Sequence, residues 1–354
     1  MSNRLLNPPV AYMASIKEIA KLAGVSVKTA SGALNDQASI RMSDETRLRV
    51  IEVANQQGYR PSFAAQAMRL GALPLVGVVS DGAINSPYAA DIMRGLEKSL
   101  ASERLTSITT MLRGDIEESV EWLEQFKPRS IIYVSGFYRR VSIPKHMVGR
   151  ILVLVNCRDA DDVIPSIVAD ELQGGRDLTQ FLIDAGHRRI GYVSLPGLDA
   201  STVRLEGVAT ALEQAGLHLD PAHVFPATSR ARYFDGEAGS VDAPLRALLA
   251  AGQLPDALIC GNDRVAMDVY AAAARLGISV SETLSVCSFD NQVELARRMD
   301  PPLTSMALPH RRMGAIAGRV CAAKDTPAHG HTLAFRLVQR QSHRVRKPEE
   351  NKGI

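Results

Sequence analysis

The sequence predicts a small all-α head followed by a larger α/β body, in which parallel sheets form two lobes. From Ser15 to Arg69 the apolar residues recur at helical spacing, and no strand-like run interrupts them. After Gly71, short β-rich runs alternate with amphipathic helical stretches. That alternation continues for longer than one ordinary domain, and the spacing of the strand and helix runs changes in the middle of the chain. We therefore expect a switch between lobes near residues 156–170 and a chain return near residues 290–307.

Each helix of the head carries its own start signal. Ser15 and Glu18 form a capping box, in which each side chain accepts from the other residue's backbone N–H. Ser26 and Ser43 are N-caps for the second and third helices, and Gly24 ends the first one at a positive φ. The apolar positions that should face inward are Ile16, Ile19, Ala20, Ala23, Ala30, Ala33, Leu34, Val50, Val53 and Ala54.

The body should contain parallel sheets with helices on both faces, because strands that alternate with helices form βαβ units. A further strand is expected after Arg336, followed by a frayed basic end. The predicted strands of the body are Leu75–Ser80, Thr106–Leu112, Ser130–Ser135, Ile151–Val155, Ser166–Ala169, Arg189–Ser194, Ala257–Cys260, Leu284–Phe289 and Leu303–Ala307.

Composition is that of a globular protein, with 46% apolar and 22% charged residues. No apolar run is long enough to span a bilayer, and residues 1–15 have no signal-peptide core. The four cysteines form no CxxC pair, which argues against a zinc ribbon or a disulfide framework. We expect a cytoplasmic protein without a membrane partner.

Charge is distributed unevenly between the head and the body. Residues 1–71 hold nine Lys/Arg and five Asp/Glu, a balance of +4, whereas the rest of the chain has a balance of −1. A basic head on a nearly neutral body indicates a polyanionic partner for the head alone. The alternative is a solvated surface that is basic without a partner, and charge by itself does not separate the two.

The strongest local motif is a helix-turn-helix with its corner at Ala23-Gly24-Val25. The small residues at the corner let two helices cross closely and leave the start of the second helix exposed. The side chains placed there, which can reach base edges and phosphates, are Ser26, Val27, Lys28, Thr29 and Ser31.

Over residues 15–342 the chain resembles the lactose/galactose-repressor (LacI/GalR) family of bacterial transcription factors. That resemblance implies a homodimer whose paired heads read a pseudo-palindromic operator, and a periplasmic-binding-protein-like core that binds a small effector. The motifs that carry it are Ala23-Gly-Val-Ser26, Ser43-x-x-Thr-Arg-x-Arg-Val50, Gly58-Tyr-x-Pro61, Gly186-His-Arg-Arg-Ile-Gly191, Arg204-x-x-Gly207, Gly261-Asn-Asp263, Leu284-Ser-Val-x-x-Phe-Asp290 and Pro302-Leu-Thr304.

The resemblance adds DNA contacts to those of the helix-turn-helix. It places Ser15, Asn35 and Tyr59 at the DNA, and it identifies residues 61–72 as a hinge helix that orders on DNA. In that hinge Ser62 is the N-cap, Ala65 allows two hinges to pack closely, and Met68 stands at the position of a minor-groove wedge. Gly32 stands where the family usually has Arg, so an operator sequence does not transfer from relatives.

The effector site is implied at the ends of strand runs, where open α/β sheets bind ligands. Arg204 and Asp290 are the sharpest candidates, because a guanidinium and a carboxylate can each bond two adjacent hydroxyls. An aromatic face can then cover a sugar ring. The full set implied by the matching motifs is Asn85, Ser86, Tyr88, Asn156, Arg204, Phe234, Asn262, Asp263 and Asp290.

Catalytic and cofactor motifs are absent from the sequence. It has no Walker loop, no GxSxG elbow and no HExxH, and His329 and His331 read as solvated surface rather than metal ligands. We therefore expect no enzyme and no cofactor, but a repressor of a carbohydrate-utilisation operon under a sugar-like effector. A sugar-binding or transport receptor, and a regulator that responds to a nucleoside or purine, remain as alternatives.

The expected organisation has five parts, which follow from the motifs above. They are an N-terminal tail (1–14), the helix-turn-helix domain (15–60), the hinge (61–72), a two-lobed effector and dimerisation core (73–342) and a C-terminal tail (343–354).

Overall fold

The computed structural model describes residues 14–34, 41–59, 74–82, 89–195, 197–227, 241–323 and 330–346. The chain divides into two compact units, residues 1–74 and residues 75–354. The predicted hinge and nearly all of the predicted N-terminal tail lie outside the described residues.

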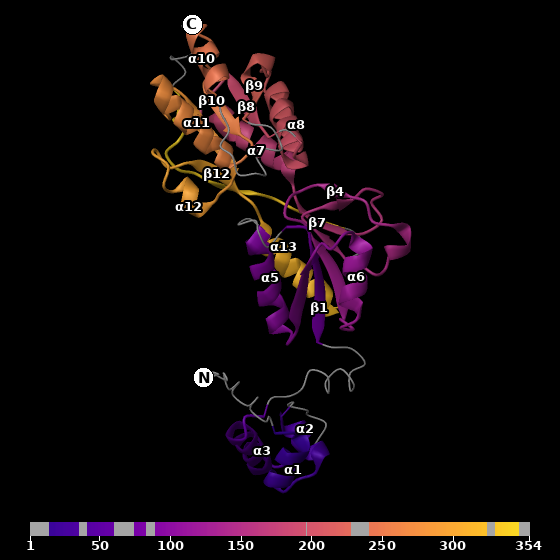
Figure 1. Cartoon of the computed structure of the whole chain (residues 1–354). Coiled ribbons are helices and arrows are strands. Elements are labelled where there is room, and N and C mark those ends of the chain that lie inside the picture. Colours follow the sequence, from indigo (N-terminus) through magenta and orange to yellow (C-terminus); the bar gives the residue numbers. More distant parts are fainter. Residues whose placement is uncertain are drawn as a thin grey trace, which may run out of the picture. The chain divides into compact units, whose positions relative to one another are not determined.

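The smaller unit is the predicted bundle of α1 (Ile16–Ala23), α2 (Val27–Leu34) and α3 (Asp44–Gln56) (Figure 1). The capping box is present, since the Ser15 backbone N–H donates to a Glu18 carboxylate oxygen at 2.6 Å and Glu18 N–H donates to Ser15 Oγ at 3.4 Å. Gly24 has φ 65°, which turns the chain into the corner between α1 and α2. The bundle closes on a small apolar core of Ile19, Ala20, Ala23, Ala30, Ala33, Val50 and Ala54.

The first sheet of the larger unit consists of parallel strands, as predicted. Helices α5 (Ala89–Ser102) and α13 (His310–Ala323) cover one face, and α6 (Ile116–Glu124) covers the other (Figure 1). Its strands, in order across the sheet, are β13 (His331–Leu333), β7 (Ser166–Ala169), β5 (Leu154–Val155), β3 (Ser130–Val134), β1 (Leu75–Ser80) and β2 (Thr106–Met111).

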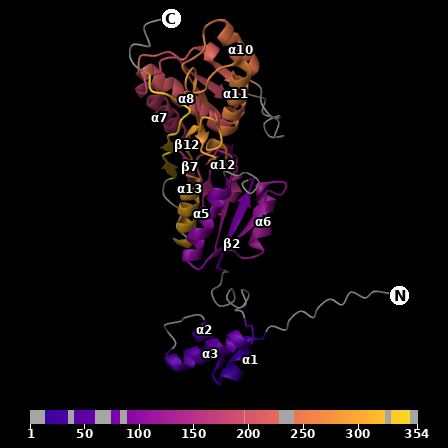
Figure 2. The same ribbon diagram turned by 90° about the vertical axis from the view of Figure 1, so that its left-hand side faces the viewer.

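The second sheet is parallel except for its antiparallel edge strand β14. Helices α7 (Glu171–Asp184) and α8 (Asp199–Gln214) cover one face, and α10 (Asp242–Ala250) and α11 (Asp263–Leu276) cover the other (Figure 2). The strands, in order across the sheet, are β14 (Arg336–Val338), β12 (Thr304–Ala307), β11 (Ser285–Asp290), β10 (Ala257–Cys260), β8 (Ile190–Ser194) and β9 (Val224–Pro226).

Alternation along the central strands explains why each sheet is covered on both faces. In β10, Leu258 and Cys260 face α10 and α11, whereas Ala257 and Ile259 face α7 and α8, and all four are buried. Several short elements, including β9 and β13, were not among the predicted runs. The others are β4 (Arg140–Val141), β6 (Arg158–Asp159), α12 (Val293–Ala296) and the 3₁₀ turns η1 (Lys145–Met147) and η2 (Pro221–His223).

The chain passes between the two sheets three times. It crosses from β7 into α7, returns from β12 into α13, and crosses again from β13 into β14. The first passage falls at the end of the predicted interval and the second just beyond residues 290–307. The third passage was not predicted: the strand expected after Arg336 is β14, but β13, which precedes it, has only three residues and was missed.

The last described residues belong to the second lobe rather than to a tail. The Arg346 guanidinium lies 2.6 Å from the Asp256 carboxylate, and His187 Nε2 donates to the Arg344 carbonyl at 3.1 Å. Burial lowers the pKa of His187 to about 4, so its ring stays neutral at neutral pH. These contacts hold residues 344–346, which fall within the predicted C-terminal tail, against the second lobe.

Two glycines let α7 and α8 cross at backbone contact. A Cβ on Gly175 would lie 2.3 Å from the Arg204 carbonyl oxygen, and a Cβ on Gly207 would lie 2.2 Å from the Leu172 carbonyl oxygen. Neither position accepts a side chain unless the helices separate. Glu171 and Arg204 lie about one turn before these glycines, so the close crossing brings their side chains together.

Replacing Gly207 with alanine should lower the free energy of unfolding by about 1–3 kcal/mol, because the added methyl group pushes α7 and α8 apart. Urea denaturation measures the change. Thr202, which is exposed on the same helix, supplies the control: Thr202→Ala should leave stability nearly unchanged. Equal stabilities of the two variants would show that the close crossing is dispensable.

Candidate functional site

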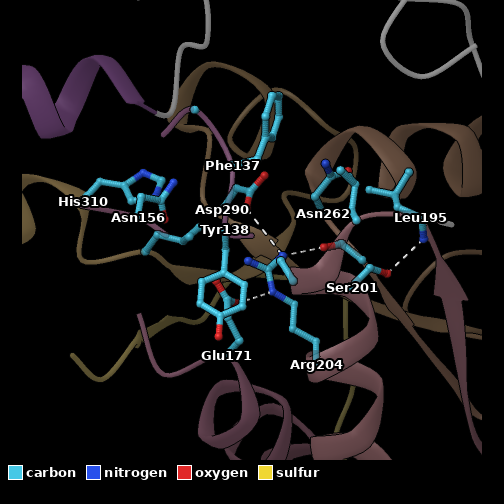
Figure 3. A pocket seen from close by; sticks show the side chains of 15 residues that line it. Phe137, Tyr138, Asn156, Glu171, Leu195, Ser201, Arg204, Asn262, Asp290 and His310 are labelled. Atoms are coloured by element: carbon cyan, nitrogen blue, oxygen red, sulfur yellow. Dashed lines mark hydrogen bonds and ion pairs between the residues drawn. The ribbon is translucent and has the colours of Figure 1, made fainter. Parts of the chain in front are cut away.

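A cleft in the larger unit lies where strands of both sheets end (Figure 3). Its lining residues follow β3, β5, β8, β10 and β12, end β11, or lie in the first turns of α7, α8 and α13. Ligands of open α/β sheets bind at this carboxyl edge, because the loops that follow the strands diverge there. Of the predicted effector residues, the cleft brings together Asn156, Arg204, Asn262 and Asp290.

Arg204 lies at the centre of the cleft and is buried (Figure 3). Its Nε donates to Glu171 Oε2 at 2.6 Å, and its Nη1 donates to the Gly261 carbonyl at 2.7 Å. Nη1 also lies 3.7 Å from Asp290 Oδ1. Burial alone would lower the pKa of Arg204, but the two carboxylates outweigh it and hold the pKa above its ordinary value. The guanidinium is therefore a permanent cation.

Aromatic rings hold the plane of this guanidinium. Its central carbon lies 4.4 Å from the ring centre of Phe289 and 5.7 Å from that of Phe335. Both distances are within the range of a cation–π contact. Because the carboxylates and rings fix Arg204 from several sides, its position is set before any ligand binds.

Two buried acceptor atoms in the cleft have no hydrogen-bond donor among the described residues. They are Glu171 Oε1 and Asn156 Oδ1, whose residues are 3% and 2% exposed. Asn156 Nδ2 is satisfied, since it donates to the Ser135 carbonyl at 3.2 Å. A buried acceptor without a donor is costly, so the cleft favours a ligand that supplies hydroxyl hydrogens.

The backbone is strained at two of these positions. Asn156 has φ 61° and Asp290 has φ 99°, which is the left-handed region that non-glycine residues rarely adopt. Strained non-glycine residues that follow or end strands are typical of binding sites, where the fold holds a side chain in a particular direction.

Asn262 and Asp263 have different roles, although they are neighbours in one predicted motif. Asn262 lines the cleft and caps α11, with Oδ1 accepting from Val265 N–H at 3.0 Å. Asp263 is not among the lining residues of the described cleft. Burial raises its pKa, although its carboxylate accepts from Ser288 Oγ at 2.5 Å and Ser305 Oγ at 2.7 Å. These bonds tie α11 to β11 and β12.

The sequence interpretation missed several lining residues. Glu171, Phe137, Tyr138 and His310 all line the cleft. Glu171, Phe137 and Tyr138 follow predicted strands within a few residues, so the rule that selected Asn156 could have found them. His310 has the same signal, because it follows the predicted strand Leu303–Ala307 by three residues.

A second compartment of about 460 Å³ shares Phe137, Tyr138 and Leu198 with the cleft. Asp81 organises its wall: it accepts from Tyr133 Oη at 3.0 Å and forms an ion pair with Arg139. The other lining residues are Arg140, Gly197 and Asp199. The backbone N–H of Arg140 donates to Asp199 Oδ2 at 3.2 Å, which links β4 to the start of α8.

Eight predicted site residues lie outside the described residues. They are Asn35, Ser62, Ala65, Met68, Asn85, Ser86, Tyr88 and Phe234.

The start of α2 presents the predicted DNA-reading surface of the head. Ser26, Val27 and Lys28 are exposed, and Thr29 and Ser31 are partly exposed. Ser26 Oγ accepts from Thr29 N–H at 3.0 Å, which caps the helix as predicted. Ser15 is exposed at the start of α1, and Tyr59 packs partly against the head core. An exposed helix start with hydroxyl, methyl and ammonium groups has the chemistry that reads a major groove.

The described residues offer neither a metal-binding cluster nor a membrane-spanning helix. They contain no cluster of three or more His, Cys, Asp or Glu arranged to hold a metal ion. Within the same ranges, every helix is too short or too polar to cross a lipid bilayer.

Two family models match the chain. Residues 15–62 match the model described as bacterial regulatory proteins, lacI family, and residues 179–343 match that of a periplasmic binding protein-like domain. The first match contains the helix-turn-helix, and the second contains Arg204, Asn262 and Asp290.

Two solved structures share the fold. A putative LacI-family transcriptional regulator from Rhizobium etli has a TM-score of 0.66 at 27% identity, covering 77% of this chain and 99% of its own. The lac repressor dimer bound to operator and the anti-inducer ONPF has a TM-score of 0.72 at 19% identity, covering 93% and 98%. The lac repressor structure, together with the two family models, confirms the predicted head and the two-lobed core with parallel sheets.

Curated relatives extend the likeness to the sequence. The sucrose operon repressor of Escherichia coli is 31% identical over 312 residues, which are 86% of this chain and 92% of the relative. The ribose operon repressor of Haemophilus influenzae is 28% identical over 310 residues, or 86% and 90%. With both its head and its core matched, the chain belongs to the lacI family of bacterial regulatory proteins, and it is a DNA-binding transcriptional regulator rather than an enzyme.

Proposed function

We propose that this regulator represses a carbohydrate-utilisation operon and that a sugar bound in the cleft controls it. The observation that carries the proposal is the cleft itself, where a fixed guanidinium lies between two carboxylates, beside buried acceptors that have no donor in the described part of the chain. This chemistry suits vicinal hydroxyls. Relatives that repress sucrose and ribose operons support the same class of effector.

The proposed DNA-bound form is a homodimer on a pseudo-palindromic operator in the cytoplasm. Residues 15–60 would form the head and residues 61–72 the hinge, with the core beginning at residue 73. Ser26, Val27, Lys28, Thr29 and Ser31 would contact bases and phosphates, supported by Ser15, Asn35 and Tyr59. In the hinge, Ser62, Ala65 and Met68 would serve as cap, packing contact and minor-groove wedge.

The proposed effector contacts are Asn156, Arg204, Asn262 and Asp290, joined by Asn85, Ser86, Tyr88 and Phe234 from outside the described residues. Because three segments connect the lobes, a ligand that bridges them can change their relative orientation. An effector that binds one DNA-binding state about 100-fold better than the other shifts the equilibrium by about 2.7 kcal/mol. That shift is sufficient to release or recruit the operator.

Fluorescence anisotropy on DNA from upstream of the gene tests this function. The full-length protein should bind with a steep salt dependence, because each phosphate contact releases counterions. A neutral sugar should change the operator affinity about 100-fold, the value used above. Absent or salt-insensitive binding would contradict the DNA-binding role. If nucleosides or purines rather than sugars change the affinity, the effector class is wrong and the role in gene control stands.

A further inference from the structure

We propose that the effector is an uncharged polyhydroxyl molecule and that Glu171 makes the cleft reject anionic sugar derivatives, such as sugar phosphates and sugar acids. The inference rests on the proposed function, because it narrows the ligand class of the same cleft. No motif of the sequence singled out Glu171, and its place in the cleft comes from the structure alone.

The charge balance of the cleft disfavours an anion. Among the described lining residues of the inner cleft, Arg204 is the only arginine or lysine, and two carboxylates already face it. Glu171 Oε2 lies 2.6 Å from Nε, and Asp290 Oδ1 lies 3.7 Å from Nη1. This side-chain set therefore carries one net negative charge when His310 is neutral. A phosphate or carboxylate would enter a buried site whose cation is already neutralised.

The outer compartment does not reverse that balance. Arg139 forms an ion pair with Asp81, which is buried. Arg140 lies 3.4 Å from Asp162 and donates to two backbone carbonyls at 3.2 Å. Asp199 adds another carboxylate to the wall. Each arginine in the described part of the cleft thus already has carboxylate or carbonyl partners.

The hydrogen-bonding groups of the cleft also favour an uncharged ligand. Glu171 uses only Oε2 for Arg204, and its Oε1 is buried without a donor among the described residues. Asn156 Oδ1 is also buried without a donor among the described residues. Both atoms accept and neither donates, so they need a ligand that supplies hydrogens. A sugar hydroxyl donates, whereas an ionised phosphate or carboxylate only accepts.

Isothermal titration of the full-length protein with matched pairs tests the inference. The neutral probes are ribose, fructose, glucose and sucrose, and each is paired with its phosphate monoester. We expect the neutral member of the binding pair to bind at least about 100-fold more tightly. A phosphate ester that binds the wild-type protein equally well or better overturns the inference and leaves the proposed function intact. If no member of any pair binds, the sugar effector and the inference both fail.

Glu171→Gln tests the role of the residue itself. The amide keeps one acceptor oxygen for Arg204, removes the charge and turns the other atom into a donor. The preference for the neutral member should fall at least about 10-fold relative to wild type. Glu124→Gln is the control: Glu124 pairs with Arg150 at 2.6 Å outside the cleft lining, so the preference should not change. An unchanged preference in a folded Glu171→Gln protein overturns the role of Glu171. If that variant does not fold, the matched pairs on wild type still decide the ligand class.

Discussion

Replacement of Arg204 by methionine should lower the free energy of unfolding by about 3–5 kcal/mol, which is the usual cost of breaking a buried ion pair. The change leaves Glu171 and Asp290 buried without their cation, and the Gly261 carbonyl loses its donor. Methionine fills a similar volume, so little of the loss comes from an empty cavity. Urea denaturation followed by circular dichroism measures it.

An exposed ion pair supplies the matched control. Arg275 contacts Asp242 through two hydrogen bonds of 2.6 and 2.7 Å, but its side chain is 56% exposed. Arg275→Met should change stability far less, since water solvates the remaining carboxylate. If the two variants lost the same stability, burial of the Arg204 cluster would not be the cause. In Arg204→Lys the positive charge remains, but the planar guanidinium is lost. Relative to Arg204→Met, this variant should therefore recover more of the lost stability than of the lost sugar affinity.

Removal of residues 1–74 should weaken operator binding by at least about 1,000-fold, the usual gap between specific and nonspecific affinity. The head holds the basic excess and the exposed start of α2, whereas the rest of the chain is close to neutral. Sugar affinity should stay within about 2-fold of that of the full chain, because the described cleft residues all lie after Pro74. Anisotropy on the operator and calorimetry with the sugar provide the two measurements.

The same two measurements carry their own control. Retained sugar binding shows that the shortened protein is folded, so lost DNA binding cannot be attributed to unfolding. A shortened protein that still recognised the promoter would place the DNA-binding surface outside the head. A shortened protein that lost both activities would show that the larger unit depends on the head for its own stability.

Local signals were sufficient for the head and for most strands. Ser15 and Glu18 form a capping box within four residues, and the structure contains it. The predicted runs at Leu75–Ser80 and Ala257–Cys260 are β1 and β10 with the same bounds. These features depend on residues close in the chain, so a sequence pattern can reveal them. The third passage between the sheets joins β13 to β14, and although a strand was expected after Arg336, the three residues of β13 are too few to show a period.

The candidate site was likewise predicted from the sequence only in part. Strand ends and family motifs identified Asn156, Arg204 and Asp290, and the structure brings these three into one cleft. The same motifs grouped Asp263 with them, but its carboxylate faces Ser288 and Ser305, which follow more than twenty residues later in the chain. Which way a strand-end side chain points depends on those distant partners.

The sequence by itself determined the order of helices and strands, the capped head and the arginine that a sugar cleft would need. Only the tertiary structure decided that Glu171 is the partner of Arg204, because Gly175 and Gly207 must first bring α7 and α8 into backbone contact. Secondary structure follows from neighbouring residues, whereas the charge balance of a cleft depends on side chains that only packing brings together.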